Sequence, residues 1–296
     1  MNSDLVDDII RRALQEDAPW GDLTSETFLP AGVTATASLV AREPGILSGI
    51  EVFARVFQLM DLSTSIDVLS KDGAVIGPGM TLARVHGDAR AVLRAERVAL
   101  NLTQRMTGIA TLTARYVAAV AGTKARIVDT RKTTPGLRML ERQAVRDGGG
   151  HNHRYSLSDA VLAKDNHLAV LSAAGIPLGD AIRAARARIG HTVHLEVEVD
   201  RLDQIDDVIS AGVDTIMLDN FTPDELETGV AAVAGRALVE ASGGVNLDTV
   251  AAIARSGVDI ISVGALTHSA RALDLGLDIG LDIGQGVGAD LDVGLA

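Results

Sequence analysis

Residues 193–242 read VHLEVEVDRLDQIDDVISAGVDTIMLDNFTPDELETGVAAVAGRALVEAS, and this stretch decides the fold. Three short apolar or β-branched runs, at 193–199, 214–219 and 237–242, are separated by segments long enough to form a helix. Strands that alternate with helices at this spacing form right-handed βαβ units, which build a parallel sheet. The stretch therefore predicts an α/β architecture.

The same pattern continues on both sides of this stretch. Further strand-like runs are ARIVD at 125–129, DAVLAK at 159–164 and DIISVG at 259–264. Six units are fewer than the eight of a closed barrel, yet polar residues follow the carboxyl end of each run, where barrels gather their active sites. We therefore expect an open, incomplete parallel α/β barrel over 109–272, with a single functional mouth.

The first third of the chain mixes element types and predicts an N-terminal α+β sandwich domain over 1–108. Its expected elements are a helix after Ser3, a strand at 33–41, an amphipathic helix at 50–60 and shorter strands near 66–69 and 80–85. One long helical stretch, 89–120, joins the two domains, and we expect a break and the domain boundary near Gly108.

The chain ends in repeated leucine, aspartate, aliphatic and glycine residues. Residues 273–284 are consistent with a strand that returns to the first domain. Residues 285–296 are glycine-rich and acidic, so they predict a mobile tail.

Composition limits the functional classes. A formal net charge of -12 repels a nucleic-acid backbone, and 2% aromatic residues leave little material for base stacking. The chain has no cysteine, which excludes thiolate catalysis and cysteine-ligated metal sites. No apolar run reaches the roughly 20 residues that span a bilayer, and the acidic start is unlike a signal peptide. We expect a cytoplasmic protein that binds neither nucleic acid nor membranes.

Positive charge is concentrated between Asp129 and His167, where seven Lys or Arg residues and three His residues lie among glycines and strand ends. Two or three such side chains in a cleft can bind a small polyanion, such as a carboxylate, a phosphate or a pyrophosphate. Arg131 and Arg154 are flanked by Thr, Gly and Asn, which favours a binding site over a solvated surface for both.

Glu196, Glu198 and Asp200 alternate, so all three side chains point to one face if 193–200 is a strand. An exposed edge strand would explain this pattern without a function. Inside a barrel, the carboxylates would need magnesium, ribose hydroxyls or lysines as partners. Glu196 could instead pair with an interior lysine.

Small residues follow the last two strands, at 242–244 and at 264–265, and their backbone N–H groups could approach a phosphate. Gly148 to Gly150 are expected to give a tight backbone path beside the substrate. His151 and His153 could form a metal pair, although no third ligand is obvious. Lys164 at a strand end could form a Schiff base, but the neighbouring Asp165 and Asp129 argue against it.

Seven motifs occur in an order that resembles the quinolinate phosphoribosyltransferase family. They are DTRKTTPG (129–136), GGGHNHR (148–154), LAKDNH (162–167), LEVEVD (195–200), IMLDNF (216–221), EASGGV (240–245) and SVGALTHS (262–269). The similarity begins at Gly21 and extends to about residue 280. It implies a sandwich followed by an open barrel, a homodimer whose sites are completed across subunits, and magnesium as cofactor.

The resemblance also implies the reaction and the residues that perform it. Quinolinate and phosphoribosyl pyrophosphate would give nicotinate mononucleotide, pyrophosphate and carbon dioxide in NAD biosynthesis, which makes the protein a glycosyltransferase of the pentosyltransferase class. The residues implied as catalytic are Lys132, Lys164, Glu198 and Asp219, of which Glu198 and Asp219 are also candidate ligands of the magnesium held by pyrophosphate. Those implied as further substrate-binding residues are Arg97 from the neighbouring subunit, Arg131, His153, Arg154, Ser242, Gly243, Gly244, Gly264, Ala265 and His268.

Two alternatives stay open. A related phosphoribosyltransferase could use another acceptor, such as the monocarboxylate nicotinate, but the cations around Arg131 and Arg154 favour a dicarboxylate. A sensor of phosphate metabolites could keep the site without turnover. The presence of both lysines and both carboxylates, Lys132, Lys164, Glu198 and Asp219, argues against it.

Overall fold

The computed structural model describes residues 3–280, which form two compact units. One unit contains the residues up to Gln104 together with those from Leu273 onward, and the other contains Arg105–Ala272. Helix α4 (Ala89–Ala119) runs without interruption through the boundary between Gln104 and Arg105. The expected break near Gly108 is therefore wrong.

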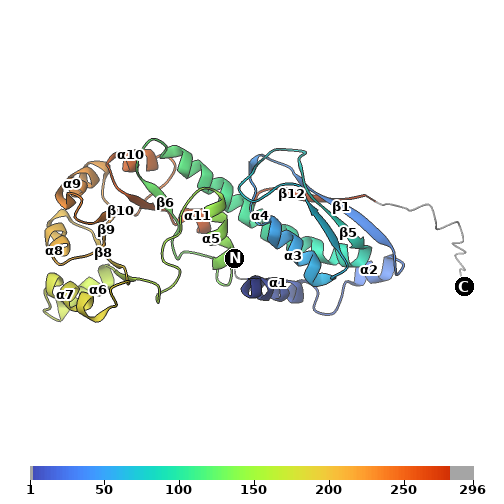
Figure 1. Cartoon of the computed structure of the whole chain (residues 1–296), viewed down its shortest axis with the longest axis horizontal. Coiled ribbons are helices and arrows are strands. Elements are labelled where there is room, and N and C mark those ends of the chain that lie inside the picture. Colours follow the sequence, from blue (N-terminus) through green and yellow to red (C-terminus); the bar gives the residue numbers. More distant parts are fainter. Residues whose placement is uncertain (1–2, 281–296) are drawn as a thin grey trace, which may run out of the picture. The chain divides into compact units, whose positions relative to one another are not determined.

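The first unit is built on an antiparallel sheet with the strand order β12-β1-β5-β3 (Figure 1). Inward side chains of β1 alternate with more exposed ones, and the ring centroids of Phe53 and Phe57 on α3 lie 5.0 Å apart in the core. Its elements are α1 (Ser3–Asp17), α2 (Leu23–Phe28), β1 (Thr34–Ala41), β2 (Gly45–Ile46), α3 (Ile50–Met60), β3 (Ser65–Val68), β4 (Val75–Ile76), β5 (Thr81–Asp88) and β12 (Leu275–Gly280).

Strand β12 lies beside β1, with Leu275 opposite Ala41. It is formed by part of the segment that the sequence marked as a possible return to the first domain. The rest of that segment, 281–284, and the predicted tail, 285–296, lie outside the described residues.

The second unit contains a six-stranded sheet with the order β6-β11-β10-β9-β8-β7, in which every neighbouring pair is parallel. The outermost strands β6 and β7 do not pair with each other, so the barrel is open, as predicted. The strands are β6 (Arg126–Val128), β7 (Val161–Ala163), β8 (Leu195–Val199), β9 (Thr215–Asp219), β10 (Leu238–Ser242) and β11 (Ile260–Ser262). The helices that accompany them are α5 (Arg138–Asp147), α6 (Asp165–Ala173), α7 (Leu178–Arg188), η1 (Leu202–Gln204), α8 (Ile205–Ser210), α9 (Pro223–Val233), α10 (Val250–Arg255) and α11 (Ala265–His268).

Strand β8 lies between β7 and β9 and all five of its residues are buried, so the edge-strand interpretation is wrong. Glu196 and Glu198 share one face of β8, as expected. Asp200 lies beyond the end of the strand and is exposed, so it does not join them. Within residues 3–280 no single helix is long and apolar enough to cross a membrane. Helices α6 and α7 are long and apolar enough for a membrane span only when they are taken together, and the chain bends by 111° between them.

Glycines on and beside α4 allow close contacts between backbone segments. A Cβ at Gly108 would overlap the carbonyl oxygen of Arg271, and one at Gly148 would lie 2.7 Å from Thr113 Cβ on α4. Of the three consecutive glycines only Gly149 has a positive φ, of 86°. Gly148 and Gly150 are therefore explained by close packing against α4, and not by a strained path beside a substrate.

We predict that Gly108→Ala lowers the free energy of unfolding by about 2 kcal/mol, because overpacking outweighs the roughly 1 kcal/mol by which alanine favours a helix over glycine. Urea unfolding followed by circular dichroism measures the change. Gly190→Ala is the matched control, since a Cβ there meets only Val193 Cγ2 at 3.9 Å. Equal stability of the two variants would contradict the packing explanation.

Candidate active site

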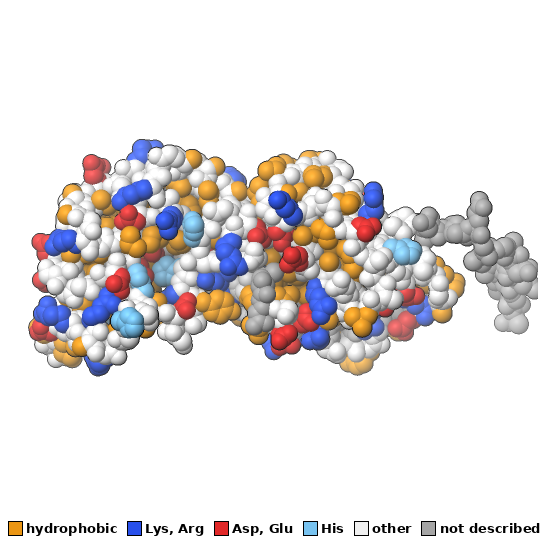
Figure 2. All heavy atoms as spheres, in the orientation of Figure 1, with side chains coloured by type: hydrophobic (Ala, Val, Ile, Leu, Met, Phe, Trp, Pro, Cys, Tyr) orange, Lys and Arg blue, Asp and Glu red, His pale blue; other side chains and the backbone are white. Residues whose placement is uncertain are grey.

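A pocket of about 590 Å³ opens at the carboxyl ends of the parallel strands in the second unit. Lys, Arg and His side chains gather on the face of this unit drawn in Figure 2, with carboxylates among them. The pocket is lined by Thr130, Arg131, Lys132, His153, Arg154, Leu162, Lys164, Glu198, Met217, Asp219, Asn220, Glu240, Ser242, Gly243, Gly244 and Ser262.

Ten of the predicted site residues line this pocket: Arg131, Lys132, His153, Arg154, Lys164, Glu198, Asp219, Ser242, Gly243 and Gly244. Gly264, Ala265 and His268 are not among the lining residues, although Lys132 Cδ would lie 3.0 Å from a Cβ built at Gly264. Arg97 is exposed on α4 and belongs to the first unit. Glu240 was not predicted from the sequence as a lining residue. Its position on β10, two residues before Ser242, could have indicated it, because Glu240 and Ser242 then lie on the same face of the strand.

The two arginines of the pocket, Arg131 and Arg154, influence each other. The Nε atom of Arg131 is buried and has no hydrogen-bond partner among the described residues. Arg154 Nη1 donates to the carbonyl oxygen of Ala160 at 3.0 Å. Burial lowers the pKa of Arg154, and the nearby charge of Arg131 lowers it further, whereas Glu196 opposes both effects. The two guanidinium groups are therefore close enough to repel each other.

Asp129, directly after β6, fastens the segment that carries His153 and Arg154. Asn152 Nδ2 donates to its Oδ2 at 2.6 Å, the backbone N–H of His153 donates to Oδ1 at 2.8 Å, and Arg142 Nη1 donates to Oδ1 at 3.3 Å. Burial raises the pKa of Asp129, and these donors counteract the rise. Asp129 therefore acts as a structural anchor rather than as a neighbour of Lys164.

Lys164 Nζ lies 2.5 Å from Glu198 Oε2 at the mouth of the pocket. The carboxylate partner of Lys164 is thus Glu198, and not Asp165 or Asp129 as expected. An aldolase lysine is activated by an apolar or cationic environment. The ion pair with Glu198 gives no support to the Schiff-base interpretation.

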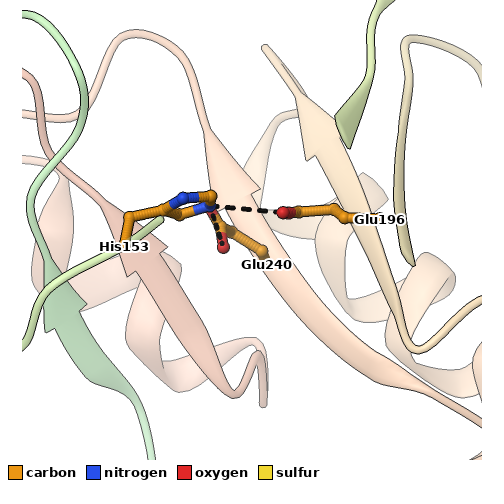
Figure 3. Close-up of side chains that lie close together, drawn as sticks. All are labelled: His153, Glu196 and Glu240. Atoms are coloured by element: carbon orange, nitrogen blue, oxygen red, sulfur yellow. Dashed lines mark ion pairs between the residues drawn. The ribbon is translucent and has the colours of Figure 1, made fainter. Parts of the chain in front are cut away.

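His153 lies between two buried carboxylates that come from different strands (Figure 3). Its Nε2 is 3.2 Å from Glu196 Oε2 on β8 and 3.5 Å from Glu240 Oε2 on β10. The predicted lysine partner of Glu196 is therefore wrong, because a histidine from a loop takes that place. The second oxygen of each carboxylate, Oε1, is buried and has no partner among the described residues.

Two of the three groups, His153 and Glu196, hold protons more tightly than free side chains do. Burial lowers the pKa of His153, but hydrogen bonds to Glu196 and Glu240 raise it to about 10. Burial also raises the pKa of Glu196. Both shifts have the same consequence, which is that the cluster of His153, Glu196 and Glu240 keeps an extra proton at neutral pH.

A metal ion does not suit this cluster, although its ligand atoms lie within 4.8 Å of one another. In the neutral ring of His153, Nδ1 accepts the backbone N–H of Arg154 at 2.7 Å, so the ring proton lies on Nε2, the atom that faces the carboxylates. A metal-bound histidine instead donates a proton from its other ring nitrogen. His151 is exposed and is not part of the cluster, so the structure does not support the metal pair with His153 that their spacing would allow.

Comparison with known proteins identifies the family. Residues 22–107 match the N-terminal domain of quinolinate phosphoribosyl transferase, and residues 109–278 match its C-terminal domain. The chain belongs to this family.

Named relatives agree over most of the chain. The nicotinate-nucleotide pyrophosphorylase [carboxylating] of Mycobacterium leprae is 46% identical over 280 residues, which cover 93% of this chain and 97% of that protein. The probable enzyme of the same name from Bacillus subtilis is 41% identical, with 94% of each chain covered. The solved structure of the nicotinate-nucleotide pyrophosphorylase from Francisella tularensis has a TM-score of 0.88 at 35% identity and covers 95% of this chain and 98% of its own.

We predict that the ring of His153 titrates well above its ordinary pKa, toward about 10, because the two carboxylates favour its protonated form and outweigh the opposing N–H of Arg154 at Nδ1. The folded-state pKa lies above the ordinary value of 6.5, so the stabilisation it gives is complete below pH 6.5 and is lost as the pH rises through about 10. NMR of protein labelled with ¹⁵N at histidine measures the midpoint, and His153→Asn assigns the signal. Glu240→Gln should move the midpoint downward. An unchanged midpoint in that variant would show that the carboxylate does not hold the proton.

Proposed function

We propose that this chain transfers the phosphoribosyl group of phosphoribosyl pyrophosphate to quinolinate, with decarboxylation, and so makes nicotinate mononucleotide for NAD biosynthesis. The observation that carries the proposal is the buried Nε of Arg131, which has no hydrogen-bond partner among the described residues and lies in a pocket at the barrel mouth that Arg154 also lines. The family and its similarly named relatives support it.

Arg131 and Arg154 bind the two carboxylates of quinolinate. Each guanidinium can form two parallel hydrogen bonds to a carboxylate, which fixes the pyridine ring as well as neutralising it. Both ring nitrogens of His153 are already engaged, Nε2 by carboxylates and Nδ1 by the N–H of Arg154. We therefore assign His153 mainly to holding the backbone at Arg154, beneath the substrate.

Lys132 and Lys164 meet the pyrophosphate, while Glu198 and Asp219 lie where the ribose would sit. As the bond from the ribosyl carbon to pyrophosphate breaks, the ribosyl ring gains positive charge, which nearby carboxylates stabilise, and the lysines offset the charge of the leaving group. The quinolinate nitrogen then bonds to the ribosyl carbon. When carbon dioxide departs, the electron pair of the broken bond stays on C2, where the adjacent positively charged ring nitrogen stabilises it, and C2 then takes a proton from water.

The loop after β10 provides the 5'-phosphate site. Gly243 has a φ of 85°, and a Cβ there would overlap the side chain of Asn220, so only glycine fits this turn. Ser242 and Gly244 line the pocket on either side, which leaves backbone N–H groups able to approach a phosphate closely. His268, Gly264 and Ala265 remain proposed contributors from the following loop.

Magnesium fits the donor set at the mouth. Glu198 and Asp219 also border an adjoining pocket with Asp165 and Asp200, and carboxylate oxygens are the ligands that magnesium prefers. When bound with pyrophosphate, the ion would neutralise charge on the leaving group. We also propose a homodimer in which Arg97 of each chain completes the neighbouring site.

The deciding experiment measures magnesium-dependent formation of nicotinate mononucleotide and carbon dioxide from quinolinate and phosphoribosyl pyrophosphate, with nicotinate as the competing acceptor. We expect turnover with quinolinate alone. Turnover with nicotinate alone would replace the proposal by that of a related transferase. Tight binding of phosphoribosyl pyrophosphate without turnover would favour another acceptor or a sensor.

We predict that Arg131→Ala raises the KM for quinolinate about 100-fold, since a charged hydrogen-bonding pair contributes about 1.5 to 3 kcal/mol. The KM for phosphoribosyl pyrophosphate should change by less than about threefold. Steady-state kinetics with each substrate varied in turn separates the two. Arg183→Ala serves as control, because that arginine forms an exposed ion pair with Asp180 on α7. An equal rise in KM for both substrates would contradict the assignment of Arg131 to quinolinate binding.

A further inference from the structure

The two cationic side chains Arg131 and Lys132 lie on a loop, residues 129–137, that follows β6 and has no regular secondary structure. Such a loop has backbone groups that need partners from elsewhere. Arg138 Nε donates to Thr133 Oγ1 at 2.9 Å, and the hydroxyl of Thr267 donates to the carbonyl oxygen of Lys132 at 2.8 Å. Side chains, and not a backbone ladder, therefore fix the position of this loop.

An ion pair between α4 and α5 organises these contacts. Arg105 Nε donates to Glu141 Oε1 at 2.7 Å, and Nη2 lies 2.5 Å from the same oxygen. Arg105 Nη2 also donates to Thr134 Oγ1 at 2.9 Å and to the carbonyl oxygen of Thr267 at 2.8 Å. The other oxygen of Glu141, Oε2, accepts the backbone N–H of Thr134 at 3.1 Å. One ion pair thus reaches the loop and the residue that holds Lys132.

Burial makes this pair costly unless it is complete. Glu141 is only 1% exposed, and a buried carboxylate without its partner is strongly destabilising, whereas an apolar pair of similar volume is often at least as stable. Stability alone therefore gives little reason for the ion pair. Its three contacts beyond the pair's own are directional, and all three involve Thr134 or Thr267, which lie close to Lys132.

We propose that Arg105 and Glu141 are positioning residues that set the location of Lys132 in the pocket without touching a substrate. Neither residue lines the pocket. The proposal rests on the proposed function only for the role of Lys132 toward pyrophosphate. A displacement of about 1 Å at a reacting group can reduce a rate about 100-fold, so loss of either partner acts on catalysis through the loop.

A double-mutant cycle tests this coupling. We expect Glu141→Ala to lower kcat/KM for phosphoribosyl pyrophosphate about 30-fold, and Lys132→Ala to lower it about 100-fold. If Glu141 acts through Lys132, the double variant resembles Lys132→Ala within about threefold, because the lysine is no longer there to be misplaced. A product of the two single effects would overturn the proposal.

Conservative and control variants separate positioning from folding. Glu141→Gln keeps an acceptor for the N–H of Thr134 and should recover most of the activity that Glu141→Ala loses. Asp214→Ala is the matched control, since Asp214 pairs with Arg186 at 2.7 Å and accepts the N–H of Leu195 at 2.7 Å, far along the strands from the mouth. We expect it to leave kcat/KM within about twofold. A loss as large as that of Glu141→Ala would show that any broken ion pair has this effect.

A binding measurement keeps this test distinct from that of the reaction. Calorimetric titration of pyrophosphate with magnesium should show about tenfold weaker binding to Glu141→Ala than to the unsubstituted protein, and the double variant should bind no more weakly than Lys132→Ala alone. Absence of quinolinate turnover in the unsubstituted protein would defeat the proposed function and leave this comparison intact. Equal pyrophosphate affinity in Glu141→Ala and the unsubstituted protein would defeat the positioning role.

Discussion

Carboxylates on the inner face of the parallel sheet need partners from outside the sheet, and the second unit depends on this constraint. Glu198 and Glu240 both lie opposite Met217, and Glu196 shares the face of Glu198, so β8 and β10 place three acids on one side. Left unpaired, each would cost several kcal/mol. Their partners come from loops and strand ends: His153 lies in the loop between α5 and β7, and Lys164 directly follows β7.

His153 enters the interior of the barrel through its open edge. β6 does not pair with β7, and the backbone at His151 instead bonds to the edge of β6 that β11 does not occupy, donating to the carbonyl of Ile127 and accepting the N–H of Asp129. A closed barrel would leave no such path for the chain. The segment therefore delivers His153 to the interior acids and Arg154 to the pocket. Asp129 and Glu141 hold the two cationic loops in comparable ways, each accepting a backbone N–H and an arginine.

The sequence was sufficient for whatever depends on local pattern. Alternation and strand-helix spacing predicted the open parallel barrel, and position at strand ends, together with the family's motifs, predicted ten of the residues that line the pocket. Contacts between distant segments were beyond reach. A glycine within a helical stretch looks the same whether it breaks the helix or admits another backbone, and the cause at Gly108 is Arg271, far along the chain. The pairing of His153 with Glu240 likewise depends on the strand order, which no local pattern encodes.

Repulsion between the pocket's two arginines gives a reason for preferring a dicarboxylate. The charge of Arg131 lowers the pKa of Arg154, which means that each guanidinium destabilises the other. Only Glu196 counteracts this among the causes that act on Arg154, and Glu196 also serves His153. Under the proposed function, a ligand with two negative charges relieves the repulsion at both arginines at once. A monocarboxylate neutralises one guanidinium and leaves the positive charge of the other without a counter-charge. The discrimination between quinolinate and nicotinate therefore follows from charge balance as well as from shape.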